Sequence, residues 1–183
     1  MDIRVILILT AEALFALWLL YKAGILKDRR YVFAAVLLTA LAFAARWAVL
    51  DYETLDYKDF LSQWVQYFRD NGGFAALSRQ IGNYNIPYLY FLALFSYSGI
   101  DDLYLIKLLS IFFDVLLAWG CALLLGRFTD SALRRVAVFF AVLFLPTVFL
   151  NGALWAQCDS SYAAFAVLGI YLALSGRPEL SMV

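Results

Sequence analysis

Histidine is absent from this chain of 183 residues. Imidazole metal ligands and the histidine-dependent activation of a serine or cysteine nucleophile are therefore excluded within it. It has only two cysteines, Cys121 and Cys158, which stand in apolar surroundings without the spacing of a metal site. We predict that both are packing residues, because free cysteine behaves as a small buried hydrophobe. We also predict no metal and no cofactor, so that any catalysis depends on carboxylates.

Charge is scarce as well. Charged residues make up 15% of the chain and hydrophobic residues 65%, whereas soluble domains average about 25% charged and about 45–50% apolar residues. The mean hydropathy is +0.81. The net charge is zero and there is no basic block, so nucleic acid is not an expected partner. This composition predicts an all-α integral membrane protein with several spans.

Five apolar stretches approach the length of about 20 residues that a helix needs to cross a bilayer. They are residues 5–21, 31–50, 103–125, 136–150 and 162–174. Basic residues gather around residues 22–30, 126–135 and 177, and the positive-inside rule places such clusters in the cytoplasm. The segments 51–102 and 151–160 are then expected outside, in a multi-pass protein of the plasma membrane.

The chain divides into two parts on this pattern. Residues 1–30 form an additional N-terminal span with a basic turn, and residues 31–183 form the main membrane module. The sequence stops soon after Arg177-Pro178 without a closing feature. We therefore expect a truncated protein or the N-terminal half of a longer one.

The outer loop, residues 51–102, is the only long segment rich in charged, amide and aromatic groups. Its apolar residues recur at helical spacing and form one face: Tyr57, Phe60, Leu61, Trp64, Val65 and Phe68. This pattern predicts an amphipathic helix lying at the membrane interface, ended by Asn71-Gly72-Gly73. Residues 88–97 are too few for a span and predict a second juxtamembrane helix or a shallow re-entrant segment.

The expected topology brings three polar groups to one outer surface. They are the acidic start of the loop, the turn near residue 84, and the junction near residue 157. Indole, amide and carboxylate groups hold sugars through stacking and paired hydrogen bonds. A neighbouring carboxylate can accept the proton of an attacking hydroxyl group. The candidate substrate-binding residues are Asn83, Tyr84, Trp155, Gln157 and Asp159.

Five motifs, in this order along the chain, resemble those of a known enzyme family. They are Asp56-Tyr57 with Phe60-Leu61 and Trp64, then Asn71-Gly72-Gly73-Phe74, NYNIPYLY, Ile106-Lys107 with Phe113-Asp114, and LWAQCDS. Together they resemble the GT-C superfamily of polyprenyl-phosphate-sugar-dependent glycosyltransferases, in particular the bacterial proteins related to the PIG-V type of GPI mannosyltransferase. The family usually has NYNPPYLY and WGQ where this chain has Ile86 and Ala156.

The resemblance implies a GT-C-like multi-span bundle with a long first outer loop. It implies transfer of a hexose, mannose by family preference, from a polyprenyl-phosphate donor outside the cytoplasm, with inversion, to a glycan or lipid acceptor. The implied base is an acidic residue of the first outer loop. By motif position it is Asp56, with Asp51 second and Asp59 third.

Simpler structural roles compete with these assignments. Asp56 stands before the amphipathic helix, where aspartate is a preferred N-cap. Asp159 with the two following serines suits an N-cap of the last span, and Trp155 suits an interfacial aromatic belt.

Two cations, Arg46 and Lys107, are the candidates for the carrier phosphate, because a guanidinium fork matches phosphate oxygens. Arg46 alternatively snorkels to the interface. Lys107 and Asp114 share a helix face and alternatively form a polar seam. The intramembrane residues Glu12, Lys107 and Asp114 would also suit a transporter or flippase. A non-catalytic remnant or a half-subunit of a transferase is the third hypothesis.

Overall fold

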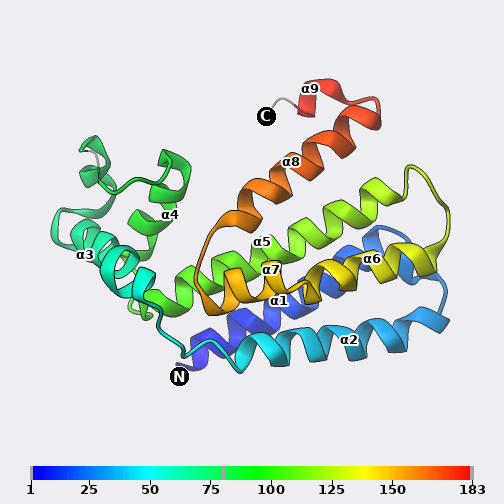
Figure 1. Cartoon of the computed structure of the whole chain (residues 1–183), viewed down its shortest axis with the longest axis horizontal. Helices are drawn as coiled ribbons and strands as arrows, with labels where there is room; N and C mark the ends of the chain where they lie inside the picture. The colour runs from blue at the N-terminus through cyan, green and yellow to red at the C-terminus, as the bar shows by residue number, and fades with distance from the viewer. Residues whose placement is uncertain (1, 80, 182–183) are drawn as a thin grey trace.

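The computed structural model describes residues 2–79 and 81–181, and this part of the chain is helical without strands (Figure 1). Its body is a bundle of long helices that lie side by side. They are α1 (Ile3–Lys22), α2 (Arg30–Trp47), α5 (Asp102–Leu125) and α6 (Ala132–Phe144). Buried side chains of all four, such as Leu20, Ala42, Ile111 and Phe139, fill the space between them.

Polar side chains define where these helices begin. The Asp2 carboxylate accepts the backbone N–H of Arg4 at 2.9 Å at the start of α1. Asp101 does the same for the N–H of Leu103 at 2.9 Å at the start of α5. Such caps satisfy N–H groups that have no partner inside the helix.

Three helices, α1, α2 and α5, are long and apolar enough to cross a membrane. The chain bends at Pro146: α6 and the following segment Pro146–Leu154 meet at 49°, and together they are long and apolar enough to form either a fourth, broken span or a re-entrant loop. That segment comprises α7 (Pro146–Phe149) and the π-helix η4 (Leu150–Leu154). These lengths and compositions are those of an α-helical membrane protein.

The predicted fifth span corresponds to α8 (Asp159–Leu174), which has 16 residues. At about 1.5 Å per residue it reaches about 24 Å, less than the hydrocarbon thickness of about 30 Å. The short helices η1 (Ile25–Lys27) and α9 (Pro178–Ser181) complete the described elements outside the loop.

The expected outer loop folds into a small helical unit at one end of the bundle (Figure 1). It comprises the π-helix η2 (Tyr57–Leu61), α3 (Ser62–Asp70), the 3₁₀-helix η3 (Gly73–Ser78) and α4 (Ile86–Phe95). The predicted apolar face exists: Leu61, Val65 and Phe68 are buried. It packs against α4 and the start of α5, whereas Phe60 of the same predicted face is exposed. Arg69 Nη2 attaches the unit to the bundle by contacting Asp102 Oδ1 at 2.6 Å.

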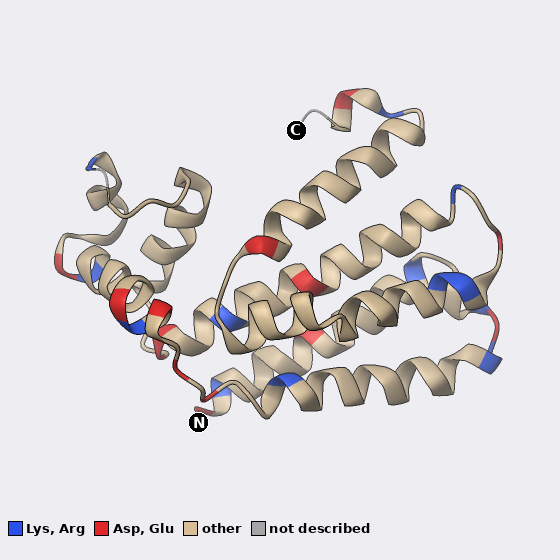
Figure 2. Cartoon of the chain, viewed as in Figure 1, with Lys and Arg blue, Asp and Glu red and all other residues tan. Residues whose placement is uncertain are grey.

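The helix ends segregate by charge. The connections from α1 to α2 and from α5 to α6 lie at the end of the bundle far from the small unit, and lysine and arginine gather there (Figure 2). Acidic residues concentrate on the first part of the small unit. The start of the small unit and the η4–α8 turn meet at the end of the bundle opposite these basic connections, because Gln157 contacts Asp56 there.

Candidate functional site

Three segments far apart in the sequence meet through one amide side chain. Gln157 Nε2 donates a hydrogen bond to Asp56 Oδ2 at 3.1 Å. The Tyr84 hydroxyl donates to Gln157 Oε1 at 2.7 Å. Gln157 thus joins a carboxylate and a phenol that stand 101 and 73 residues before it. The structure brings together these three of the residues that the sequence predicts.

A hollow of about 220 Å³ opens beside this chain of hydrogen bonds, and we call it the site hollow. Its lining is Asp56, Phe60, Leu61, Trp64, Asn83, Tyr84 and Gln157. The Trp64 ring meets the Tyr84 ring edge-on, with centroids 5.4 Å apart. The hollow therefore combines a carboxylate, two amides and aromatic rings, which are the groups that hold a sugar ring.

Trp64 enters the hollow because the helix is wider after Asp56. The π turn η2 adds one residue to the helical path. Trp64, eight positions after Asp56, then stands about two turns away on the same side. Gly82 permits this ring position, because a Cβ atom there would lie 2.6 Å from the Trp64 ring. The amphipathic pattern assigned Trp64 to the apolar face and gave no sign of a π turn.

Asp56 does not cap the helix that follows it, so the capping interpretation is wrong. Its backbone is already helical, with φ −58° and ψ −39°, and its side chain makes no capping hydrogen bond. Thr54 Oγ1 instead accepts the N–H of Tyr57 at 3.3 Å. The Asp56 carboxylate is exposed and meets the amide of Gln157.

Gln157 is fixed through its backbone as well as its side chain. Its N–H donates to the carbonyl of Asn151 at 3.0 Å. Its own carbonyl accepts from the Ser110 hydroxyl at 2.8 Å. The preceding residue, Ala156, has φ +62° and is buried. A non-glycine residue in this conformation costs about 1–2 kcal/mol, so the surrounding contacts must hold the turn in place.

Asp56 also lines a second hollow of about 540 Å³ on its other side. The remaining walls are Tyr52, Glu53, Thr54, Leu55, Lys58, Leu154 and Trp155. Lys58 and Glu53 form an exposed ion pair there at 3.0 Å. Asp56 therefore lies on the wall between two spaces, each with an aromatic side chain.

Two predicted sugar contacts lie outside the site hollow. Trp155 borders the second hollow, and Asp159 borders a different one of about 450 Å³. Asp159 Oδ2 accepts from Asn151 Nδ2 at 2.7 Å. Asp159 occupies the first turn of α8 and not its N-cap position, which Cys158 holds. Asn83, another candidate sugar contact, lines the site hollow.

Asp51, the second candidate base, is held elsewhere. Its Oδ1 accepts the hydroxyl of Tyr104 at 2.7 Å. It does not line the site hollow, which Asp56 does. Of the two candidate bases, Asp56 is therefore the one beside the site hollow.

The placement of Arg46 and Lys107 does not support their predicted contact with a carrier phosphate. Lys107 is buried, and its Nζ donates to the carbonyls of Val49, Leu50 and Tyr52 at 2.9, 2.9 and 2.6 Å. An ammonium group has three protons, so all are used on the segment that follows α2. Lys107 thereby fixes the chain that leads to Asp56.

Arg46 is buried in the bundle and does not snorkel. Its Nη2 contacts Asp114 Oδ2 at 2.9 Å and donates to the carbonyl of Leu143 at 3.0 Å. Leu143 lies at the end of α6, where the break before Pro146 leaves carbonyls without a helical partner. The predicted polar seam exists, but Asp114 pairs with Arg46 rather than with Lys107.

Replacing Lys107 with methionine is expected to lower the free energy of unfolding by about 2–3 kcal/mol, because hydrogen bonds to a charged donor are lost. Denaturant titration in detergent measures the change. Lys58→Met is the control, since its ion pair is exposed and should contribute less than about 1 kcal/mol. Unchanged stability with lost function in Lys107→Met would contradict the structural role and restore the phosphate-binding one.

Two tyrosines of the small unit predict a dependence of stability on alkaline pH. Burial raises the pKa of Tyr57 and of Tyr84 from 10.0 to about 12. The folded chain therefore keeps two protons that the unfolded chain releases above pH 10. Their contribution to stability is complete below pH 10 and is lost between pH 10 and about 12. The measurement is the free energy of unfolding at several pH values between 10 and about 12. A Tyr57→Phe/Tyr84→Phe variant should lose less of it with rising pH than the parent does. An equal dependence on pH in both proteins would contradict the prediction.

Among residues 2–79 and 81–181, no three Cys, Asp or Glu side chains lie close enough together to hold a metal ion. Comparison with protein-family models, with curated proteins and with solved structures finds no match to the chain. The function is therefore argued from the site itself.

Proposed function

We propose that the protein is a membrane glycosyltransferase in which Asp56 is the general base. The observation that carries this proposal is the position of Asp56. Its carboxylate is oriented by Gln157 on the wall between the site hollow and the second hollow. A transfer reaction needs two substrates to meet at one proton acceptor, and this position serves that need.

The reaction is a displacement at the anomeric carbon. The acceptor hydroxyl oxygen attacks C1 of the hexose, and the bond between C1 and the phosphate oxygen breaks with inversion. The electron pair leaves with the lipid phosphate, and the hydroxyl proton moves to Asp56. Gln157 donates to Oδ2, which leaves Oδ1 to take this proton. Trp64 and Asn83 contact the sugar ring in the site hollow.

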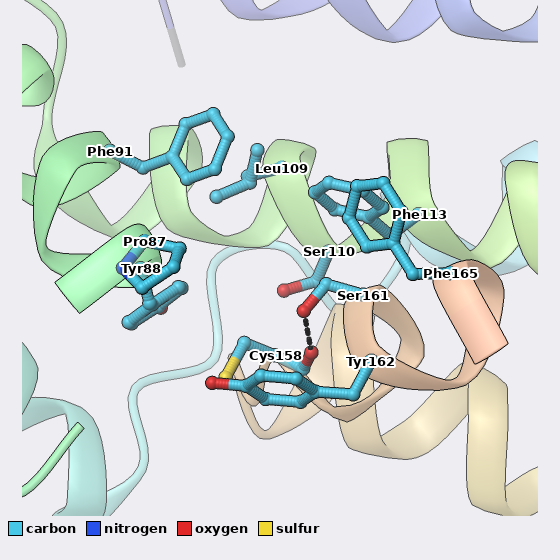
Figure 3. A pocket seen from close by; sticks show the side chains of 10 residues that line it. All are labelled: Pro87, Tyr88, Phe91, Leu109, Ser110, Phe113, Cys158, Ser161, Tyr162 and Phe165. Carbon is cyan, nitrogen blue, oxygen red and sulfur yellow. Dashed lines mark hydrogen bonds between the residues drawn. The ribbon is translucent and has the colours of Figure 1, made fainter. Parts of the chain in front are cut away.

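An apolar cavity of about 330 Å³ supports a lipid-linked donor (Figure 3). It lies between α4, α5 and α8 and is lined chiefly by aromatic and aliphatic side chains: Pro87, Tyr88, Phe91, Leu109, Phe113 and Phe165. It adjoins the site hollow, because the Tyr88 and Tyr84 rings have centroids 5.0 Å apart. We assign the sugar to the hollow and the first carbon units of a polyprenyl chain to this cavity.

Two further observations support the resemblance to GT-C enzymes. Ala156 has φ +62°, the conformation that glycine adopts without strain, and the family pattern WGQ has glycine there. Lysine and arginine gather in the helix connections at the end opposite the site (Figure 2), and by the positive-inside rule this supports a position of Asp56 outside the cytoplasm. The charged residues Glu12, Arg46 and Asp114 line neither the site hollow nor the apolar cavity, which disfavours a transport path there.

The test is hexose transfer in proteoliposomes. The purified chain is supplied with radiolabelled polyprenyl-phosphate hexoses, mannose first, and with a total membrane glycan and lipid extract as acceptor. We expect label to move to an acceptor in a chain-dependent manner. Movement of the label into the vesicle lumen, without transfer to an acceptor, would support a transporter instead. No transfer and no hydrolysis of any polyprenyl-phosphate hexose would reject the proposal.

A further inference from the structure

We infer that a buried network of Arg46, Asp114 and Ser160 positions Gln157, and through it the Asp56 carboxylate. The catalytic consequence rests on the proposed function, whereas the positioning is a property of the fold. The network lies in the interior of the bundle and its charged side chains touch neither hollow beside Asp56.

Asp114 is the centre of this network. Its Oδ2 contacts Arg46 Nη2 at 2.9 Å, and its Oδ1 accepts the Ser160 hydroxyl at 2.6 Å. The charged side chains are 1% and 0% exposed. Ser160 stands three residues after Gln157 at the start of α8. The contact therefore anchors the chain just beyond the turn that carries Gln157.

The same face of α5 also contacts Gln157 directly. Ser110, one helical turn before Asp114, donates to the Gln157 carbonyl at 2.8 Å. Gly152 lies directly on this face: a Cβ atom there would come within 3.2 Å of Ser110 and 3.3 Å of the Asp114 carboxylate. Two side chains of one helix thus hold Gln157 itself and Ser160, three residues after it.

Arg46 extends the network to the broken span before the turn. It donates to the carbonyl of Leu143 at 3.0 Å, and its guanidinium lies 5.5 Å from the centroid of the Phe149 ring. These contacts fix the end of α6 and the end of α7, between which the chain bends. An ion pair with this many partners has little freedom to move, and charges so buried are costly unless they are paired and hydrogen-bonded. The network therefore sets the register at which the turn meets Asp56.

Cys158 gives a readout of the turn that does not depend on enzyme activity. It follows Gln157 directly and is 3% exposed. Its side chain lines the apolar cavity (Figure 3), so slow labelling reflects access through that cavity, and a faster rate in a variant reports opening of the turn. The experiment measures the rate of N-ethylmaleimide labelling in detergent, in a Cys121→Ala background so that Cys158 is the only thiol.

Ser160→Ala is the decisive variant, because it removes one hydrogen bond and leaves the ion pair intact. We expect it to label at least about tenfold faster than the parent, since a hydrogen bond to a charged acceptor no longer opposes opening. Ser160→Thr keeps a hydroxyl and should restore slow labelling. Ser96→Ala is the matched control, because this buried hydroxyl bonds only within its own helix, to the carbonyl of Ala93 at 2.7 Å.

Labelling of Ser160→Ala at the parental rate would overturn the inference. An equal acceleration in Ser96→Ala would do so too, because it would indicate general loosening. In the transfer assay, Ser160→Ala should lower kcat with little change in KM, and Ser160→Thr should recover it. If the parent shows no transfer, the proposed function fails while the labelling rates still decide whether the network positions the turn.

Discussion

Hexose transfer by the Asp56→Asn variant is expected to fall at least about a hundredfold, the usual contribution of a general base. Asparagine has the same shape and keeps a partner for Gln157, but it cannot accept the proton of the acceptor hydroxyl. The variant should therefore fold and insert as the parent does. The measurement is the initial rate of label transfer at equal protein level, with folding checked by thermal unfolding in detergent.

Asp59→Asn is the matched control for this experiment. Asp59 is exposed one turn further along the same helix, and it is the third carboxylate that the sequence suggests as a base. We expect it to retain most of the parental rate. Full activity in Asp56→Asn, or loss in Asp59→Asn alone, would move the base away from Asp56.

Replacement of Asp114 with leucine is expected to cost about 3–5 kcal/mol of stability, because the buried Arg46 then loses the carboxylate that it contacts. Unfolding in detergent by denaturant or heat measures this loss. Asp102→Leu is the control. Asp102 lies on the same helix as Asp114, but its ion pair with Arg69 is partly exposed and should be weaker.

The double variant Arg46→Met/Asp114→Leu separates stability from positioning. It removes both buried charges, so most of the lost stability should return. Cys158 should nevertheless label rapidly, because Ser160 has lost its acceptor. If the double variant is as unstable as Asp114→Leu, the ion pair contributes more to stability than the neutralisation of one charge by the other. Slow labelling would show that Asp114 does not hold the turn.

The meeting of Asp56, Tyr84 and Gln157 could be predicted because it depends on topology. Helices that cross a bundle place their connections at one end or the other, and the apolar stretches locate those connections well. The break between α6 and α7 has a local cause in the sequence, since Pro146 removes a backbone donor.

Features that depend on helix rotation could not be predicted in this way. The partner of Asp114 is set by how α2 and α5 turn toward one another, and the sequence offered Lys107 because it shares a face with Asp114 on α5. The place of Trp64 depends on the π turn after Asp56, which no residue type signals. The start of α8 at Asp159 was missed because the apolar stretch in the sequence begins only at residue 162.

The wide separation of Asp56 and Gln157 along the chain has a consequence for biogenesis. Synthesis proceeds from the N-terminus, so the nascent chain already contains Asp56 when more than half of the protein is still to be made. The amide that orients it stands 101 residues later, and the hydroxyl that anchors the amide comes later still. The Asp56 carboxylate therefore lacks its oriented partner until the last described long helix has docked. If the proposed transfer occurs, we expect it to begin only at that stage.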